Sequence, residues 1–406
     1  MKKTIAAFCV LSASAGYTQA QSNIVVYGIV DASVVYTNQA AAASTANPRG
    51  TGSLFQVTSG AIQQSRLGFK GTEDLGGGLS ALFSLESGFN EDTGAMGNSQ
   101  VGSSSGTLFG RSSYVGLSST QLGTVNIGRR KDFTDNIATY YSSVVDFGIL
   151  INGVHDNNLD RVGGNRGNNM IAYYSPEMHG VTLNGSYALG ETAGSAAVGS
   201  AYGFGANYNG GPFAIGFAYW TAKTGSAAAT ESDQSTTSLC SSGTTFGGAG
   251  ATCLKTFNIG SSYTTGPVRF FGMFSRTLQP NAVAASTSLN LANTFTSAVN
   301  TGTFSAAGTN NSQTNVIDLG LDYNLTPALK LQGSFIQSRE VFVASSTKGK
   351  VNQLNMGVDY YLSKRTDIYL NAAFQSTSHM YSPGITVAPG ADNSQFIVMT
   401  GVRTTF

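Results

Sequence analysis

From residue 24 to Phe406 the chain repeats one pattern, in which apolar and small polar residues alternate in runs of about ten. A clear run is 317–325, where the odd-numbered positions are apolar or aromatic and the even-numbered positions are Asp, Gly or Asn. Alternation places successive side chains on opposite faces of a β-strand. With many such strands and no helical partner, we expect the apolar faces to meet lipid and the polar faces to line a water-filled lumen.

The composition favours a membrane barrel over a soluble sheet protein. Charged residues make up 11% of the chain, whereas a soluble protein usually has about 25%. The chain has 51 glycines, and residues 21–406 contain no apolar run as long as a spanning helix needs, which is about 20 residues. A membrane barrel accounts for each of these features.

The N-terminus has the features of a secretory signal peptide. Lys2 and Lys3 precede an apolar stretch over 5–11 and a small-residue region that ends at Ala20. The alternative is a membrane anchor, but that stretch is too short to span a bilayer. We therefore expect residues 1–20 to be cleaved and residues 21–406 to form one β-barrel domain.

The mature chain is nearly neutral. Loss of Lys2 and Lys3 leaves 20 basic residues against 21 acidic ones, a formal charge of −1. This argues against nucleic acid as a partner, because phosphate binding needs a basic excess. Cys240 and Cys253 remain, and an oxidising compartment favours a disulfide between them. Metal binding is the alternative, although no histidine lies near either cysteine.

Alternation predicts sixteen antiparallel strands and a marked asymmetry in their connections. Short turns containing Gly or Pro, such as 209–211 and 265–267, alternate with long connections such as 37–63 and 132–167. Outer-membrane barrels have short periplasmic turns and long extracellular loops, whereas a soluble sandwich has no reason to sort its loops by length. The predicted strands are 24–36, 64–71, 78–89, 111–118, 123–131, 168–177, 180–190, 201–209, 212–223, 255–265, 267–277, 314–326, 328–341, 351–363, 366–378 and 394–406.

Several phrases resemble the general porins of β-proteobacteria, the Gram-negative porin family typified by Burkholderia and Neisseria proteins. The phrases are VYGIVDA at 26–32, SRLGFKGTEDLG at 65–76, FGR at 109–111, YVGL at 114–117, NIGR at 126–129, and YSPE at 174–177 with Gly180. The resemblance implies a homotrimer of 16-stranded transmembrane barrels in the bacterial outer membrane, with the third loop folded into the pore. Departures occur at Met178-His179 and Thr405, at a turn and near the terminus.

The pattern and the resemblance together predict a general diffusion porin for inorganic ions and small hydrophilic solutes. By the same resemblance, the terminal Phe406 serves as an assembly signal, which implies the barrel-assembly machinery as a partner. Lipopolysaccharide and outer-membrane lipid are the other expected partners. We recognise no cofactor-binding, phosphate-binding or metal-binding motif in the sequence.

Residues 132–167 are the expected constriction loop. This connection carries Asp132, Asp135 and Asp146 together with apolar residues that a solvent-exposed loop would not need. A loop packed on the inner wall of a barrel would need them. Charged rings and pore width determine which solutes a pore admits, so these carboxylates are candidates for one side of a transverse electric field.

The opposing basic wall is expected on nearby strands. Arg66 and Lys70 share the polar face of 64–71. Arg130 occupies one of the alternating positions of its strand that are expected to face the lumen. Arg111 and Arg129 match basic positions of the family, although strict alternation would place both outward unless a bulge intervenes. The arginines and the family precedent favour a weak anion preference. Structural ion pairs that hold the loop are the alternative role for any of these residues.

Three other functional classes fit the sequence less well. A barrel enzyme would need a nucleophile and a base, yet His155, His179 and His379 accompany no nucleophile motif, so no enzyme is predicted. A surface solenoid would need a fixed repeat, which the chain lacks. A substrate-specific channel with a saturable site is the nearest alternative, although the inward tyrosines recognised in the sequence are dispersed.

Overall fold

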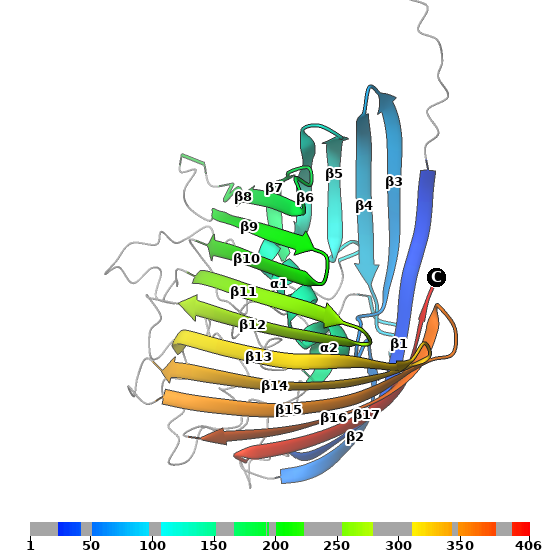
Figure 1. Cartoon of the computed structure of the whole chain (residues 1–406), viewed down its shortest axis with the longest axis vertical. Helices are drawn as coiled ribbons and strands as arrows, with labels where there is room; N and C mark the ends of the chain where they lie inside the picture. Colours follow the sequence, from blue (N-terminus) through cyan, green and yellow to red (C-terminus); the bar gives the residue numbers. More distant parts are fainter. Residues whose placement is uncertain are drawn as a thin grey trace, which may run out of the picture.

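The computed structural model describes residues 23–41, 51–96, 107–151, 166–191, 193–194, 200–222, 254–278, 311–342, 348–378 and 392–406. These residues form one antiparallel sheet in which β17 pairs back with β1, so that the sheet closes into a barrel (Figure 1). The strands are β1 (Asn23–Ala41), β2 (Thr51–Ser59), β3 (Arg66–Gly76), β4 (Leu79–Gly88), β5 (Ser112–Ser119), β6 (Gly123–Lys131), β7 (Arg166–Tyr174), β8 (Val181–Ala188), β9 (Ala201–Gly210), β10 (Phe213–Ala222), β11 (Leu254–Thr265), β12 (Val268–Leu278), β13 (Asn311–Thr326), β14 (Leu329–Phe342), β15 (Lys348–Tyr361), β16 (Thr366–Ser378) and β17 (Ser394–Thr405).

The 17 strand segments occupy 16 positions around the barrel, because β2 and β3 share one position. On one edge, β1 pairs with β3 over residues 23–29 and with β2 over residues 32–41. The bend at 60–65 separates the two partners. The predicted 16-stranded barrel is therefore confirmed, and each predicted strand overlaps an observed one.

The prediction of one long loop over 37–63 is wrong. Residues 37–41 extend β1, and residues 51–59 form β2. The alternation in β2 is weak because its outward face carries only Phe55 and Val57, both highly exposed, among small polar residues. This segment becomes a strand by hydrogen bonding to the long β1, a partner that local patterning does not reveal.

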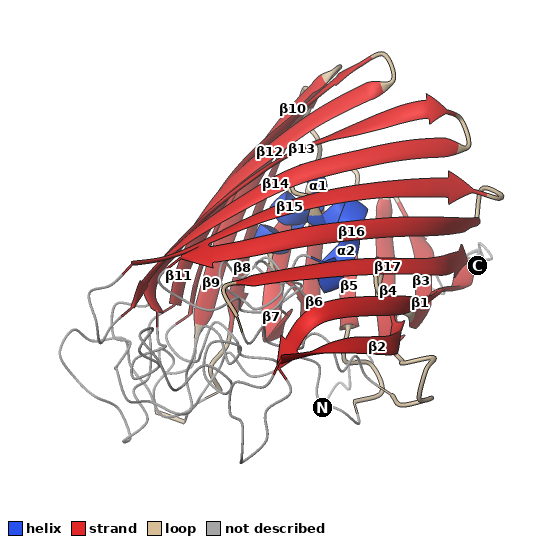
Figure 2. Cartoon of the chain, turned by 90° about the horizontal axis from the view of Figure 1, so that it is seen from below, coloured by secondary structure: helices blue, strands red, loops and turns tan. Residues whose placement is uncertain are grey.

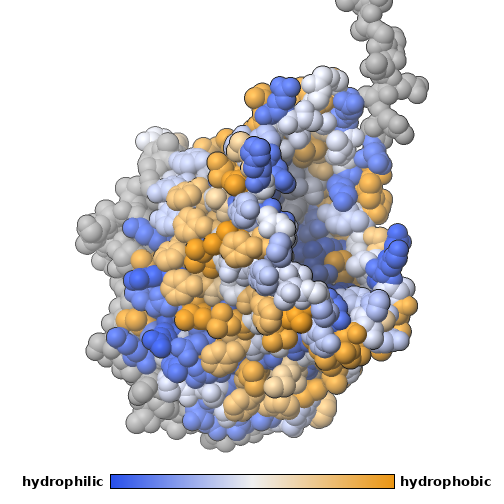
Figure 3. All heavy atoms as spheres, in the orientation of Figure 1, coloured by the Kyte–Doolittle hydropathy of each residue, from blue (hydrophilic) through white to orange (hydrophobic). Residues whose placement is uncertain are grey.

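The two faces of the barrel wall differ in polarity as the alternation predicts. On β15, Leu354 and Met356 point outward and are 44% and 58% exposed, whereas Gln353 and Asn355 point inward and are buried. Figure 3 shows hydrophobic residues gathered over the outer surface and a hollow lined by more hydrophilic ones. The outer face therefore suits lipid and the inner face suits water.

Two helices, α1 (Phe133–Tyr141) and α2 (Val144–Ile151), lie inside the barrel (Figure 2). Two glycines of the inner wall leave room for side chains of α1: a Cβ at Gly216 would meet Ile137 and Tyr141, and a Cβ at Gly260 would meet Tyr141. Helix α1 contacts β9 to β12, and α2 contacts β15 and β16. No helix of the described residues is long and apolar enough to cross a membrane.

The connections sort by length, as predicted. The turns between β3 and β4, β9 and β10, β11 and β12, β13 and β14, and β15 and β16 are all short. Because the strands of the closed sheet are antiparallel, these turns lie at one end of the barrel, here called the short-turn end; Figure 1 shows the turn from β3 to β4 and that from β9 to β10. The segment that contains α1 and α2 leaves the opposite end after β6 and enters the lumen. Its predicted end at 167 is two residues late, since β7 begins at Arg166.

Candidate functional site

Basic side chains gather on the part of the inner wall formed by β3 to β7. We call this set the basic wall; it comprises Arg66, Lys70, Arg111, Arg130, Lys131 and Arg166. The described carboxylates that pair with it are those of Glu86 on β4 and Asp135 on α1. Within the part of the chain that the structure describes, the basic groups of this wall therefore outnumber the carboxylates seen to pair with them.

Arg111 is the buried centre of the basic wall. Its Nε donates to the Glu86 carboxylate at 2.6 Å, and a terminal nitrogen donates to the Gln64 side chain. The Tyr27 hydroxyl donates to the other oxygen of Glu86 at 2.9 Å, and Nε of Arg166 donates to the Arg111 carbonyl at 2.7 Å. With this many partners, Arg111 holds neighbouring strands and the wall together, and its charge is partly neutralised.

A bulge lies beside Arg129 in the pairing of β6 with β7. The pairing of β6 with β7 shifts register between Gly128 and Arg130, and Gly128 has φ of 139°, which a glycine adopts readily. Arg129 then donates to the Gly110 carbonyl at 2.7 Å and to the Asn168 side chain at 2.5 Å. These two contacts hold the Arg129 side chain against the residues before β5 and against β7, and its role in the pore stays a prediction.

Arg130 and Lys70 point into the lumen and contact aromatic rings. The Arg130 guanidinium lies 5.1 Å from the ring centre of Tyr114 and 4.6 Å from that of Tyr174. The Lys70 ammonium is exposed and lies 5.2 Å from the Tyr27 ring centre. Such stacking stabilises a cation without neutralising it. Among the described residues, neither side chain has a carboxylate partner.

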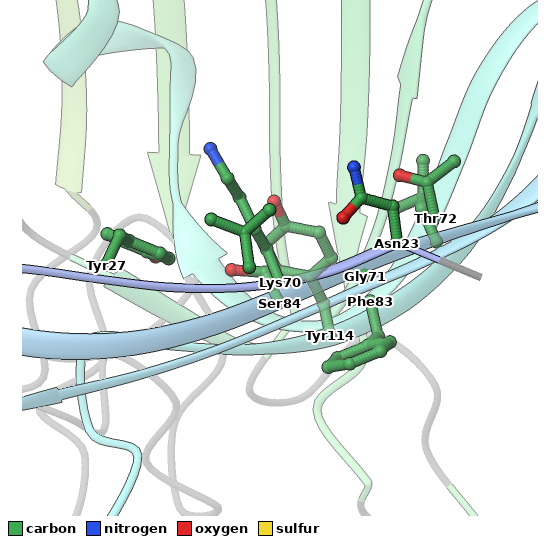
Figure 4. Close-up of a pocket in the computed structure, with 10 residues that line it drawn as sticks. Asn23, Tyr27, Lys70, Gly71, Thr72, Phe83, Ser84 and Tyr114 are labelled. Carbon is green, nitrogen blue, oxygen red and sulfur yellow. The ribbon is translucent and has the colours of Figure 1, made fainter. Parts of the chain in front are cut away.

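Lys70 lines a cavity of about 450 Å³ on the inner side of β1, β3, β4 and β5. Figure 4 shows the cavity with Lys70, Ser84 and Tyr114 among its lining groups, while the Phe83 ring lies on the other side of the sheet. An exposed ammonium among hydroxyl groups can attract and hydrogen-bond a passing anion.

Two of the predicted loop acids have local structural partners. Asp132 is the N-cap of α1, where its carboxylate accepts a hydrogen bond from the Thr134 backbone N–H at 2.8 Å and another from the Thr134 hydroxyl. Asp135 pairs with Lys131 at 2.7 Å. Asp132 thus starts the helix, and Asp135 lies against the basic wall.

The third predicted acid, Asp146, pairs on the other side of the lumen. Its carboxylate lies 2.5 Å from the Lys330 ammonium of β14, and Asp322 of β13 lies 3.7 Å from the same ammonium. Burial raises the pKa of Asp146 to about 7; the Lys330 charge lowers the pKa and the Asp322 charge raises it further. This pair attaches α2 to the inner wall.

Further contacts hold the helices on the same wall. The Ser143 backbone N–H and hydroxyl donate to the Asp318 carboxylate at 2.7 and 2.6 Å. Arg269 donates to Asp322 at 3.0 Å and to the carbonyl of Tyr140. These bonds come from β12 and β13, so the inserted segment is fixed at several points along its length.

Glycine is required where α2 meets the bend between β2 and β3. Gly148 has φ of 68°, and a Cβ at this position would lie 2.3 Å from the backbone of Ile62. Any side chain would therefore both strain the backbone and push the helix away from the wall.

Several charged residues were not assigned to the site from the sequence. They are Glu86, Lys131, Arg166, Arg269, Asp318, Asp322 and Lys330. Most of them occupy inward positions of alternating strands, and a charge at such a position is the signal that could have marked them. The partners of these residues cannot be predicted from the sequence, because the partners lie on other strands or on the inserted segment.

The chain ends at the seam that closes the barrel. Phe406 exchanges backbone hydrogen bonds of 3.1 Å with Gly28 of β1, and its ring covers the outward side of that glycine. Its role as an assembly signal stays a prediction. Cys240 and Cys253, like residues 1–20, lie outside the described residues, so the predicted disulfide also stays a prediction.

Known proteins resemble the chain over its whole length. A family model described as Gram-negative porin matches residues 6–379. Outer membrane porin protein 32 of Delftia acidovorans is 30% identical over 428 aligned positions, which cover 100% of both chains. An outer membrane porin protein of Bordetella pertussis is 34% identical over 199 residues, covering 47% of this chain and 48% of that protein.

Solved structures agree with this result. An anion-selective porin from Comamonas acidovorans superposes with a TM-score of 0.68 at 26% identity, covering 95% of this chain and 100% of that one. The trimer form of OmpT from Vibrio cholerae has a TM-score of 0.61 at 12% identity, covering 95% and 99% of the two chains, and shares the fold.

Proposed function

This chain belongs to the Gram-negative porin family, and from that premise we propose that its pore prefers anions and that residues 132–167 form its constriction. The protein is an outer-membrane porin, whose water-filled barrel gives ions and small hydrophilic solutes passive passage. The finer proposals concern how the lumen selects among those solutes.

The observation that carries the anion preference is the unequal pairing of charges on the two walls. On β12 to β14, Lys330 and Arg269 both face carboxylates. On the basic wall, Arg130 and Lys70 have no carboxylate partner among the described residues, and each lies against an aromatic ring instead. Among the described residues of the basic wall, the charge without a carboxylate partner is therefore positive.

Uncompensated cations in a lumen with low-dielectric walls raise the local concentration of anions. The effect is largest where the passage is narrow, because neither water nor salt fully screens the charge there. Helices α1 and α2 occupy part of the lumen, which supports their role as the constriction. The structural neighbour from Comamonas acidovorans, described as anion-selective, also supports this preference.

The test is the reversal potential of the channel in a planar bilayer with a salt gradient. Replacing both Lys70 and Arg130 by glutamine should move the reversal potential toward that of a cation-preferring pore. Lys364→Gln is the matched control, because this lysine lies exposed in the short turn between β15 and β16. An unchanged reversal potential in the double variant would contradict the proposal. An equal shift of the reversal potential in the control would contradict it as well.

The homotrimer is also a proposal, and family membership supports it. Lipopolysaccharide, outer-membrane lipid and the barrel-assembly machinery are proposed partners on the same ground. Exposed outward residues such as Leu354 and Met356 supply the apolar surface that lipid contact needs. Cross-linking in isolated outer membranes should yield a trimer. Recovery of the monomer alone after cross-linking would contradict the proposed trimer.

A further inference from the structure

A second cavity, of about 480 Å³, lies at the short-turn end of the lumen beside α1. It is lined by residues of β8 to β12 and of α1, by Tyr174 at the end of β7, and by the turn that follows it. Its volume lies within the range of small-molecule sites, about 300–1,000 Å³. The basic residues discussed above, other than Arg269, are not part of its lining.

The strand side of this cavity carries closely spaced amide and hydroxyl groups. Asn207 of β9 lies opposite Thr182 of β8 and opposite Gly216 of β10. Asn209 lies opposite Ala214, which in turn lies opposite Ser262 of β11. Side chains on paired positions of neighbouring strands lie about 5 Å apart. The cavity thus presents several side-chain donors and acceptors within the span of one small molecule.

The helix side of the cavity is aromatic. Tyr140 is 61% exposed toward the lumen, and its ring centre lies 6.3 Å from that of the buried Tyr141. Tyr174 completes this side, where its ring packs edge-on against Phe133 with the centres 5.2 Å apart. An exposed ring opposite a polar strand surface can cover the apolar C–H face of a solute whose hydroxyl groups meet the amides.

The charges in the lining do not favour an ionic ligand. The guanidinium of Arg269 already donates to Asp322 and to the Tyr140 carbonyl. Glu177 is the other charged group of the lining, and its sign is opposite. Amides and hydroxyls both donate and accept hydrogen bonds, as the hydroxyls of a neutral solute also do. The chemistry therefore matches an uncharged polyhydroxylated molecule better than an anion.

We infer that this cavity is a binding site for a neutral sugar of one or two rings, held between the Tyr140 ring and the amides of Asn207 and Asn209. The inference rests on the proposed porin function, since it gives the channel a saturable site on its path. The inference goes beyond that function because it names the class of solute that this site binds. The ions preferred by the basic wall would pass beside this site.

The test measures how glucose and maltose block the ion current through the channel in a planar bilayer. Block by the sugars should saturate, whereas polyethylene glycol at matched viscosity should lower the current without saturation. Calorimetric titration of the detergent-solubilised protein with the same sugars measures binding without conduction. Gluconate serves as the anionic counterpart of glucose.

Two exposed side chains offer variants that should fold normally, Tyr140→Ala and Asn209→Ala. Their combination should weaken sugar binding at least about tenfold, which corresponds to ~1.4 kcal/mol, and leave conductance without sugar nearly unchanged. Asn324→Ala is the matched control, because Asn324 is an exposed amide on the polar face of β13 outside this cavity. It should bind sugar as the wild type does.

Three results would overturn the inference: current that falls only with viscosity and no calorimetric binding, tighter binding of gluconate than of glucose, or equal loss of binding in the control. Conduction without sugar binding would refute the site and leave the porin function intact. Sugar binding by a folded barrel that conducts no ions would refute the porin function and leave the site.

Discussion

The contact between α2 and β14 gives a quantitative prediction about how the inserted segment is held. The Lys330 ammonium lies 2.5 Å from Asp146 and 3.7 Å from Asp322, and the Asp146 side chain is only 2% exposed. Lys330→Met would leave a buried carboxylate without its cation, which costs about 3–5 kcal/mol. Asp146→Asn should cost less, about 1–3 kcal/mol, because Asp322 remains as a partner for Lys330.

The double variant should be more stable than the sum of the single effects predicts. With both charges removed, neither side chain is left as an unpaired ion, so the coupling energy should be roughly 1–3 kcal/mol. The control is Lys364→Met, which removes an exposed lysine of a short turn and should change stability by less than about 0.5 kcal/mol.

The size of this coupling should depend on pH. Burial raises the pKa of Asp146 to about 7, so the folded protein binds this proton more tightly than the unfolded chain does. Ionisation of Asp146 therefore lowers stability as the pH rises from about 4, its ordinary pKa, to about 7. Lys330→Met should be much less harmful at pH 5, where Asp146 can become neutral, than at pH 8.

The assay is urea unfolding of the protein refolded into lipid vesicles, followed by fluorescence. The chain has one tryptophan, Trp220, which is fully buried on the inner face of β10 and so reports loss of the barrel. The reasoning is refuted if the two single effects add within about 0.5 kcal/mol at pH 8. It is also refuted if the coupling energy is the same at pH 5.

Two further predictions concern residues singled out in the sequence. Asp132→Ala should lower the free energy of unfolding by about 1 kcal/mol through loss of the α1 N-cap, whereas Asp132→Asn should not; equal losses in the same urea titration would contradict a capping role. Phe406→Ser should reduce the amount of folded protein in outer membranes, measured by heat-dependent gel mobility, with little effect on refolding into vesicles. Equal amounts in both preparations would argue against an assembly signal.

The alternation of side chains was enough to predict most of the fold. The strands β13 and β15, for example, are legible because the period of two is a local property of an extended chain whose faces meet different solvents. The strand β2 was not predicted, because its own sequence does not show a clear alternation. Its residues have few apolar side chains, and pairing with the far half of β1 is what makes them a strand.

The site could be predicted from the sequence only in part, because local alternation does not reveal contacts with other strands. Alternation along one strand puts Lys70 on the polar face, where it lies against the Tyr27 ring, but alternation cannot place Arg129, because a bulge beside Gly128 shifts the pairing of β6 with β7. A bulge depends on the neighbouring strand as much as on its own residues. The tyrosines of the second cavity were also missed, because Tyr140 and Tyr174 come from different elements.

The sequence by itself determined a lipid-facing barrel with a polar lumen, because hydrophobicity and backbone period are properties of each strand alone. Only the tertiary structure decided what each charge does. Asp132, Asp135 and Asp146 are alike in the sequence, yet one caps a helix, one joins the basic wall and one binds Lys330, 184 residues away. The energy of a charge depends on burial and on partners within a few ångströms, and closure of the barrel brings those partners together.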